Sequence, residues 1–530
     1  MSIQKPSSDA IVANRAEHQL AKRGPRRKRS LGLFDATRAT FVRAASRPGT
    51  SRARPELVAR RFLGYLPRVL EAVTTARDRY GSSVETHETP PSSRPWLIGF
   101  ALLHIACQLL LLVPALSSVR TLVRVAAFGV SLLFLVLIPS KRVRRTSLRA
   151  CALCILVLLG LEFFHPEGSG LLAALAAIMM NLAVLAPIFW VPRTGSTGTR
   201  LHSLITILWL FYTASAALGV LQAYFPGQFQ PPLSAVLAAK GSSALAGLEI
   251  QLASGERVFR PMGLTDSPGG AAGAGLYALL FGLGALLSEK PAFRGARLVA
   301  VGGMVAGLMC LYLCQIRSLV IMAGVCTLTL FAVLLISGRI SKLVGLLGAV
   351  SVLIPAAFAL ALAIGGESMT ARLTTLVADE PSAVYYNNRG RFLDRTLNYY
   401  LPRYPLGAGL GRYGMVHSYF GEATGGLWAE IQWTAWLFDG GFPLIVLYVT
   451  AIFVASWGCL RIARWQHGAD GESLGLWAAV ILAYDVGALA VCFNYPLFQG
   501  TGGVEFWLLN MSVLCAAQNN DRGAIRGSPS

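Results

Sequence analysis

Blocks of apolar residues recur along this chain and constrain its fold more than any other feature. Most blocks hold about 17 to 25 residues, the length that crosses the hydrocarbon core of a bilayer as one helix. Hydrophobic residues make up 54% of the chain and charged residues 14%, whereas a soluble protein carries roughly a quarter charged residues. The chain is therefore expected to be an all-α polytopic membrane protein and not a string of soluble domains.

The apolar blocks predict about twelve transmembrane helices. We place the spans at about 97–117, 121–140, 149–165, 170–192, 202–224, 268–288, 298–316, 318–337, 343–365, 433–458, 473–493 and 502–518. They form a transmembrane domain over 96–520, which follows a tail over 1–95 and precedes a short tail over 521–530.

The N-terminal tail is basic, with 19 Lys and Arg against 8 Asp and Glu in residues 1–95. Its densest run is Lys22–Arg29, and no apolar segment follows it closely enough to make a signal peptide. We expect a largely disordered cytoplasmic tail that is attracted to anionic membrane lipids. Nucleic-acid binding is not expected, because basic runs beside membrane spans usually set orientation.

The distribution of charge between the spans predicts their direction. With the N-terminus in the cytoplasm, each even-numbered span ends inside, and each short inner loop carries Lys or Arg, as in 141–145, 290–297 and 339–342. The short outer loops at 165–168 and 494–502 carry neither. This pattern satisfies the positive-inside rule. It puts both termini in the cytoplasm and two long loops, about 225–267 and 366–430, outside.

The larger outer loop is predicted to be partly helical. Arg391 and Arg395 are four residues apart, which suggests a short amphipathic helix that ends at Pro402. The run Pro-Leu-Gly-x-Gly-x-Gly that follows contains Gly407, Gly409 and Gly411. It is too rich in glycine for a helix or strand, so we expect a tight loop whose backbone approaches another surface closely.

Arginine is the basic residue of this loop, which contains no lysine between Arg372 and Arg412. The guanidinium group is a planar fork that binds phosphate oxygens in two places at once. The arginines concerned are Arg372, Arg389, Arg391, Arg395, Arg403 and Arg412. A surface ion pair, for example between Arg391 and Asp394, is the alternative for any one of them.

Two further arginines belong to the outer side under this topology. Arg260 ends the first long outer loop, and Arg317 lies between two apolar spans. A charge at such a place is costly and marks a functional site unless it only anchors the helix at the interface. Three separate segments thus carry arginine to one side of the membrane, where they could meet on one polyanion.

These segments resemble the O-antigen ligase and Wzy-type polysaccharide polymerase superfamily. The matching features are Arg260-x-x-Gly263 before a span, Arg317-Ser318 at the start of another, the arginine-rich loop with its glycine run, and Asp439-Gly440-Gly441-Phe442 inside the next span. The resemblance covers about 255–460. Wzy polymerases also carry an arginine sixteen residues before a glycine in two outer loops, and the pairs Arg391/Gly407 and Arg257/Gly273 have this spacing.

The resemblance implies an inverting, GT-C-like membrane glycosyltransferase of the bacterial inner membrane that needs no metal or cofactor. Its donor would be an undecaprenyl-diphosphate-linked glycan, held at the diphosphate by Arg260, Arg317, Arg389 and Arg391. The acceptor would be a glycan, lipid A core or another hydroxyl group. Ligases of the family usually have histidine about eleven residues before the glycine of the next span. Here Glu430 has that position and His417 lies upstream, so both are candidates for the catalytic base.

Three other functions fit parts of the sequence. A protein O-oligosaccharyltransferase of the same superfamily would use the same donor with a protein hydroxyl as acceptor. A secondary transporter could also have twelve spans, and Asp485 is the one candidate for an ionisable residue at mid-membrane, although an interhelical hydrogen bond to Tyr or Ser is the more ordinary interpretation of it. A non-enzymatic scaffold would leave the outer arginines unexplained.

Overall fold

The structure is a computed structural model of the full 530-residue chain. It describes residues 95–526 apart from 139–145, 232, 234–244, 246–247, 253, 375–382, 384, 422–425 and 466–470. The basic tail, the inner loop at 141–145 and the end of the C-terminal tail therefore lie outside the described residues.

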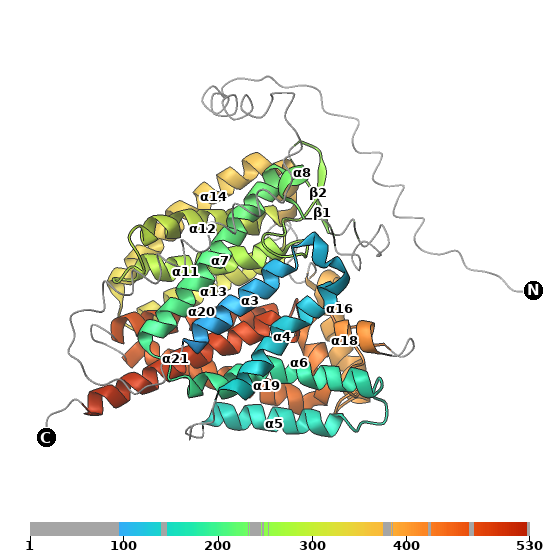
Figure 1. Cartoon of the computed structure of the whole chain (residues 1–530). Coiled ribbons are helices and arrows are strands. Elements are labelled where there is room, and N and C mark those ends of the chain that lie inside the picture. The colour runs from blue at the N-terminus through green and yellow to red at the C-terminus, as the bar shows by residue number, and fades with distance from the viewer. Residues whose placement is uncertain are drawn as a thin grey trace, which may run out of the picture. The chain divides into compact units, whose positions relative to one another are not determined.

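The described chain is almost entirely α-helical (Figure 1). Its long helices are α3 (Trp96–Leu110), α4 (Arg120–Leu137), α5 (Ser147–Glu162), α6 (Leu171–Trp190), α7 (Gly198–Tyr224), α11 (Gly270–Leu287), α12 (Ala296–Leu313), α13 (Arg317–Ile336), α14 (Ile340–Thr374), α19 (Gln432–Trp465), α20 (Gly471–Val491) and α21 (Thr501–Arg526). Short helical turns are η2 (Pro114–Val119), η3 (Val191–Arg193), α8 (Pro226–Phe229) and η6 (Leu497–Gln499). One antiparallel hairpin joins β1 (Glu249–Gln251) to β2 (Arg257–Phe259).

Every predicted span coincides with a helix, but the count of about twelve membrane spans is not reached. Nine helices of the described chain are long and apolar enough to cross a membrane, which makes this a multi-pass membrane protein. The three that fall short are α3, α5 and α21. With 15 and 16 residues, α3 and α5 are only about 23 Å long, less than the roughly 30 Å of the bilayer core. The apolar stretch of α21 is interrupted by Glu505 and Asn510.

Small residues let the central helices approach closely. Gly275 of α11 and Gly307 of α12 face each other, and a methyl group added to either would lie 2.5–2.6 Å from the other's carbonyl oxygen. Glycine at a helix contact is the usual means of close packing in membranes, where lipid removes the hydrophobic drive for helices to associate. This contact fixes α11 against α12 and so fixes the segments at both of their ends.

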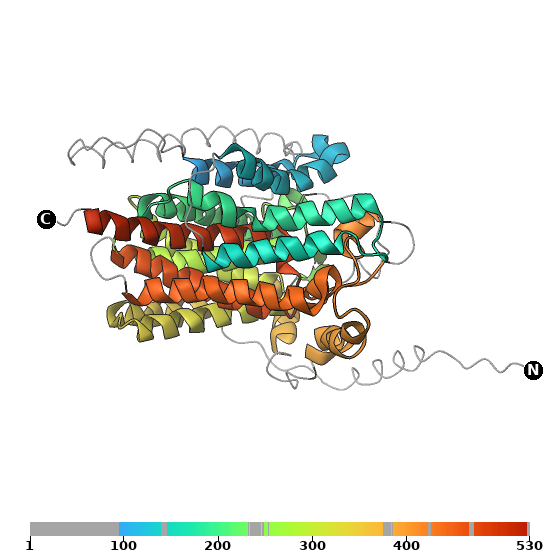
Figure 2. The ribbon, with the colours of Figure 1, turned by 90° about the horizontal axis from the view of Figure 1, so that it is seen from below.

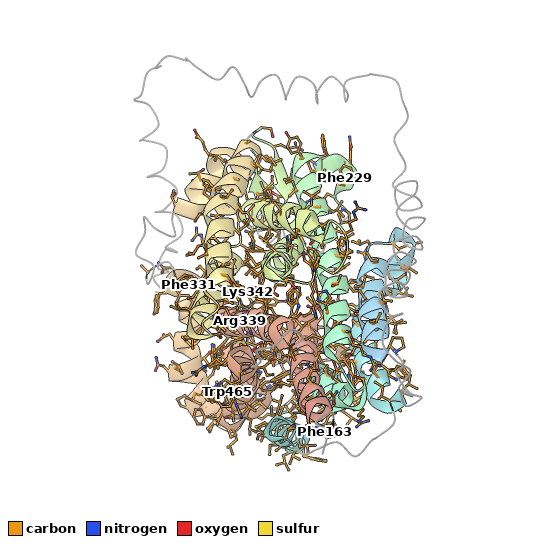
Figure 3. All side chains as sticks on the ribbon, turned by 90° about the vertical axis from the view of Figure 1, so that its left-hand side faces the viewer. Phe163, Phe229, Phe331, Arg339, Lys342 and Trp465 are labelled. Atoms are coloured by element: carbon orange, nitrogen blue, oxygen red, sulfur yellow. The ribbon has the colours of Figure 1, made fainter. Side chains whose placement is uncertain are left out.

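The two ends of the helix bundle differ in character (Figure 2). One end, here called the loop face, carries the α5–α6 turn, the β1–β2 hairpin and the described segments 385–421 and 426–431. The opposite end, the basic face, carries Arg339 and Lys342 in the α13–α14 turn, which lie within the helix bundle in the view along it (Figure 3). Arg339 donates to the Ala463 carbonyl at 3.4 Å, and Lys342 pairs with Glu289 at 3.3 Å. These contacts tie the α13–α14 turn to its neighbours.

Asp485 of α20 is buried and makes interhelical hydrogen bonds. It accepts from Asn510 of α21 at 2.7 Å and from Ser456 of α19 at 3.1 Å. The hydrogen-bonding interpretation of this residue is therefore confirmed. A second buried group joins α3, α7 and α21, where Glu505 contacts His104 at 3.1 Å and accepts a hydrogen bond from Tyr212. Both groups hold helices of the bundle together.

Candidate functional site at the loop face

The arginine-rich segment of the large loop is one continuous helical stretch. It consists of the π-helical turn η4 (Tyr386–Gly390), α16 (Arg391–Arg395), the π-helical turn η5 (Thr396–Tyr400) and α17 (Leu401–Arg403). The predicted helix is confirmed, and it ends one residue after Pro402. The Thr396 hydroxyl lies 2.5 Å from the Thr434 hydroxyl at the start of α19. This buried contact holds the stretch against the membrane domain.

The glycine run that follows is the tight loop that the sequence predicts. Gly407, Gly409 and Gly411 have φ of +129°, +86° and +77°, a region that side chains other than glycine rarely adopt. Each also touches the α5–α6 turn. An added methyl group would lie 2.6 Å from Glu162 at Gly407, 3.0 Å from the Gly168 backbone at Gly409 and 2.7 Å from the Ala173 carbonyl carbon at Gly411.

The same loop fills a break in α19. The break lies at Gly440 and Gly441, whose φ and ψ are non-helical. Phe442 N–H donates to the Pro405 carbonyl at 2.9 Å, and Ala408 N–H donates to the Phe438 carbonyl at 2.8 Å. Backbone groups released by a broken membrane helix need such partners, because lipid offers none. The glycine run and the Asp-Gly-Gly-Phe segment therefore interlock through their backbones.

Asp439 lies at this break, 2% exposed, and faces a cavity of about 210 Å³. Its carboxylate accepts from the Tyr413 hydroxyl at 2.9 Å and from Gln499 Nε2 at 3.3 Å. Burial, together with the Asp439 carboxylate, raises the pKa of Tyr413 well above its usual range, so the phenol keeps its proton and donates it. We call this space, which Gly411, Tyr413, Asp439 and Gln499 help to line, the loop-face cavity.

His417 lies beside the loop-face cavity, on α18 (Gly414–Phe420). Val416, the preceding residue, lines the cavity. The His417 Nδ1 atom is 3.0 Å from the Ser169 hydroxyl in the α5–α6 turn. A methyl group added at Gly426 would lie 2.5 Å from Nε2, so this glycine leaves the room that the ring occupies. The imidazole is thus half-buried and held by a residue that is 248 positions distant in sequence.

Glu430, the other candidate base, is engaged with a candidate diphosphate ligand. Its carboxylate forms an ion pair with Arg389, whose side chain is 37% exposed, and accepts from the Trp428 indole at 2.8 Å. Partial burial lowers the pKa of Arg389, but a guanidinium group remains charged at neutral pH. The structure therefore makes these two predicted site residues partners of each other.

Arg260 and Arg317 belong to a second neighbourhood at the loop face. Gly269 touches both Ile316, which precedes Arg317, and the Arg260 side chain: an added methyl group would lie 2.6 Å from Ile316 Cδ1 and 3.8 Å from Arg260 Cδ. The segment after Arg260 is fixed by Gln222 of α7, whose amide oxygen accepts from Met262 N–H at 2.8 Å and from Gly263 N–H at 2.7 Å. The Arg317 Nε atom is buried and has no hydrogen-bond partner among the described residues.

The two neighbourhoods lie at the same end of the bundle. Gly487 of α20 packs against Met322 and Cys326 of α13. Along α13, Arg317 lies five residues before Met322, and along α20, Val491 lies four residues after Gly487. Each of these steps is roughly 6–8 Å of helix. The Phe493 carbonyl just beyond α20 accepts a hydrogen bond from Tyr385 at 3.4 Å, one turn before Arg389. The end of α20 therefore links the two groups.

Arg391 is more peripheral than the other three candidate ligands. Its side chain is exposed, donates to Asn387 at 3.3 Å and lies 6.0 Å from the Tyr386 ring centroid. The sequence offers a surface ion pair between Arg391 and Asp394 as an alternative. In the structure the Asp394 carboxylate accepts a hydrogen bond from Asn398 at 2.7 Å. Arg391 is thus available to a ligand at the surface of the helical stretch, and among the described residues no contact fixes it beside Arg260 or Arg317.

Sequence reasoning missed three polar groups that the fold brings to the loop face. The sequence indicates Asp439 only as part of a motif, and Gln499 belongs to a short outer loop that carries no charged residue near it. The third is an ion pair between Arg124 of α4 and Asp266, at 2.5 Å. It fixes the segment that follows Arg260, and the sequence signal for it is that Arg124 lies near the outer end of one predicted span and Asp266 lies just before another.

The chain matches no protein-family model, and no curated protein sequence matches it. Within the described ranges, no group of three or more His, Cys, Asp or Glu side chains is placed to hold a metal ion. What the loop face offers chemically is a set of guanidinium groups, a histidine, and a cavity with a carboxylate and an amide.

Proposed function

We propose that this protein is a membrane glycosyltransferase of the O-antigen ligase and polysaccharide polymerase type. It would lie in the bacterial inner membrane with its loop face in the periplasm and both termini in the cytoplasm, and α3, α5 and α21 would cross the membrane together with the nine long apolar helices. Its donor would be an undecaprenyl-diphosphate-linked glycan and its acceptor a sugar or other hydroxyl group.

The observation that supports this proposal best is the interlock between the glycine run and the break in α19. The Pro405 and Phe438 carbonyls accept the hydrogen bonds that close it, and the loop-face cavity lies directly beside it. A broken helix is tolerated at membrane depth where it lines a site. Here it joins the arginine-rich stretch, His417 and the cavity into one region.

The chemistry would be substitution at the anomeric carbon of the donor. The acceptor oxygen forms a bond to that carbon, the bond from carbon to the diphosphate oxygen breaks, and its electron pair stays on the diphosphate. Arg260 and Arg317 would stabilise the charge that develops there, since guanidinium groups held in place before the reaction need no reorganisation. A base removes the proton of the acceptor hydroxyl.

Of the two candidate bases, His417 suits this role better. Its Nδ1 atom is held by Ser169, which leaves Nε2 as the nitrogen that could take a proton. The Glu430 carboxylate already binds Arg389 and Trp428. A carboxylate paired in this way is a weaker base, so Glu430 would position Arg389 instead.

The transporter alternative is less well supported. Both carboxylate oxygens of Asp485 accept hydrogen bonds from neighbouring helices, one from Asn510 and one from Ser456. These bonds give Asp485 a structural role in helix packing. The choice among ligase, polymerase and protein O-oligosaccharyltransferase depends on the acceptor.

Complementation of a deletion strain tests the proposal. Arg317→Ala and His417→Ala should each abolish polymer formation while the protein reaches the membrane in normal amounts, and Arg294→Ala, an exposed arginine of the basic face, should not. Wild-type amounts of polysaccharide in both site variants would refute it. The lipid-linked intermediates that accumulate would distinguish a ligase from a polymerase, because a ligase defect leaves long lipid-linked chains and a polymerase defect leaves single repeats.

A further inference from the structure

The exposed side of the helical stretch over 386–403 carries arginine at regular intervals. Arg391, Arg395 and Arg403 are exposed, and their numbers differ by four or eight, with the exposed Tyr399 at the position between the last two. We call these four side chains the arginine row. An α-helix has about 3.6 residues per turn, so residues four apart wind slowly around it.

Two π-helical turns straighten this row. The turns η4 and η5 lie on either side of α16, and their i→i+5 hydrogen bonds give each turn more residues than an α-helical turn has. The stretch therefore averages about four residues per turn, and residues four apart stay in line. Turns of this kind are rare and occur often at functional sites.

The buried side of the stretch has the same four-residue repeat. Thr396, Tyr400 and Tyr404 all face the outer end of α19. The Thr396 hydroxyl contacts the Thr434 hydroxyl, and the rings of Tyr400 and Tyr404 have their centroids 5.0 and 6.4 Å from that of Phe438. The arginine row lies on a different side of the stretch and stays uncovered. At about 1.5 Å per residue, it is roughly 18 Å long.

Among the described residues, no carboxylate forms an ion pair with the arginine row. Arg391 and Arg403 each donate to a neutral side chain, at 3.3 and 3.0 Å. Asp394, the one acid of the stretch, accepts from Asn398 instead. Like charges four residues apart on a helix repel and destabilise it. A ligand with spaced negative charges would remove this repulsion.

The composition of the exposed side favours a soluble polymer over a membrane surface. A helix that lies on a bilayer places several aliphatic or aromatic side chains in the acyl region beneath its cations. Here Leu397 is the only exposed aliphatic residue described in the stretch. Tyr386 and Tyr399 lie among the arginines, with the Arg391 guanidinium 6.0 Å from the Tyr386 ring centroid. Aromatic faces beside hydrogen-bonding groups suit sugar rings, and guanidinium forks suit carboxylates.

We infer that the arginine row binds an anionic oligosaccharide whose sugar units carry carboxylate groups. The carboxylates would pair with Arg391, Arg395 and Arg403, and a sugar ring would lie against Tyr399. The row ends two residues before Pro405, whose carbonyl joins this segment to the break in α19, so the bound chain would lead toward the loop-face cavity. The assignment of this chain to the transferred glycan rests on the proposed function, whereas its binding to the row does not.

Titration calorimetry on the full chain in phosphatidylcholine nanodiscs tests the binding. The probes are hexagalacturonate and the neutral maltohexaose, which has the same number of sugar units. The acidic hexamer should bind at least about tenfold more tightly, because several arginine–carboxylate pairs add to its affinity. An increase from 50 to 500 mM NaCl should weaken its binding by about tenfold or more. Equal binding of the two hexamers would overturn the inference.

Two competitors decide between the classes of partner. Hexaglutamate has the same number of carboxylates on a peptide, and vesicles of phosphatidylglycerol present anionic lipid headgroups. Neither should displace hexagalacturonate at equal concentration of negative charge. Displacement by the peptide would assign the row to an acidic polypeptide, and displacement by the vesicles would assign it to a membrane surface. Either result would overturn the inference.

Paired variants locate the binding. Arg391→Ala combined with Arg395→Ala removes two exposed charges and should weaken hexagalacturonate binding about five- to tenfold, with no change in melting temperature. Arg294→Ala combined with Arg297→Ala removes as many exposed charges from the basic face and should have no effect. Arg395→Lys keeps the charge but loses the planar fork, and it should weaken binding about threefold. Equal affinity in the two double variants would contradict the assignment to the row.

Arg317→Ala separates this inference from the proposed function. It should abolish polymer formation and leave hexagalacturonate binding unchanged. The polysaccharide that is missing from the deletion strain should contain carboxylate-bearing sugars, and a neutral polysaccharide would overturn the assignment to the transferred glycan. If polymer formation survives Arg317→Ala while the row still binds hexagalacturonate, the glycosyltransferase proposal fails and the binding row stands.

Discussion

Replacement of Gly441 by alanine tests whether the interlock at the break in α19 holds the site together. Gly441 has φ of +66°, and an added methyl group would lie 2.3 Å from the Pro405 carbonyl oxygen and 2.5 Å from Leu406 Cα. Both contacts are to backbone, which cannot move without separating the glycine run from α19. The variant should therefore lose stability through backbone strain and through steric overlap.

The strain alone can be measured at a matched position. Gly295 has φ of +88° in the turn before α12, and a methyl group there would meet nothing within 4 Å. Gly295→Ala should cost about 1–2 kcal/mol, the usual cost of a non-glycine residue in this region. Gly441→Ala should cost that amount plus the overlap, roughly 3–5 kcal/mol in total.

A thiol-reactive fluorescent dye gives the readout, because the chain has nine free cysteines of which seven are buried. Their exposure on heating reports unfolding of the helix bundle in detergent or nanodiscs. Gly441→Ala should melt several degrees below Gly295→Ala and should also lose polymer formation. Equal melting temperatures for the two variants would refute the reasoning, since they would mean that Pro405 and Leu406 do not press on Gly441.

Three further changes test the polar groups of the bundle. His104→Leu leaves Glu505 buried with only part of its hydrogen bonding and should destabilise the protein by about 2–4 kcal/mol, measured as the fall in melting temperature. Arg124→Ala should cost about 1–2 kcal/mol because it unpairs Asp266, and the double variant with Asp266→Ala should recover part of the loss. Asp485→Asn retains an acceptor for its neighbours and should leave polymer formation near the wild-type level, whereas loss of activity with normal folding would favour a transport role.

The positions of the helices could be predicted from the sequence because they depend on local properties. An apolar block long enough to cross a bilayer is helical wherever it occurs, since lipid leaves its backbone no other partners. The glycine run was also predictable, because Gly407, Gly409 and Gly411 share a composition that excludes helix and strand. The number of spans was less accessible. It depends on how far α3 and α5 extend. Helix ends are set by turns and tertiary contacts, and the average hydropathy of a sequence window contains no information about these.

The contacts of the site were not predictable, because they join residues that are far apart in the chain. Nothing local to Glu430 indicates that it pairs with Arg389, and nothing near His417 indicates Ser169, which is 248 residues away. The break in α19 was hidden for another reason. Two glycines inside an apolar block indicate only that the helix is less stable there. The break is stable because the Pro405 carbonyl accepts a hydrogen bond from Phe442 N–H, a contact that the sequence does not indicate.

Binding of undecaprenyl diphosphate to the purified protein in nanodiscs tests the central claim most directly, which is that arginines of the loop face hold a lipid diphosphate. Arg260→Ala and Arg317→Ala should each weaken binding by about tenfold or more, as expected for the loss of a charge-assisted hydrogen bond. Arg294→Ala at the basic face should bind like the wild type. Equal affinity in all three variants, or a loss only at Arg294, would contradict the account.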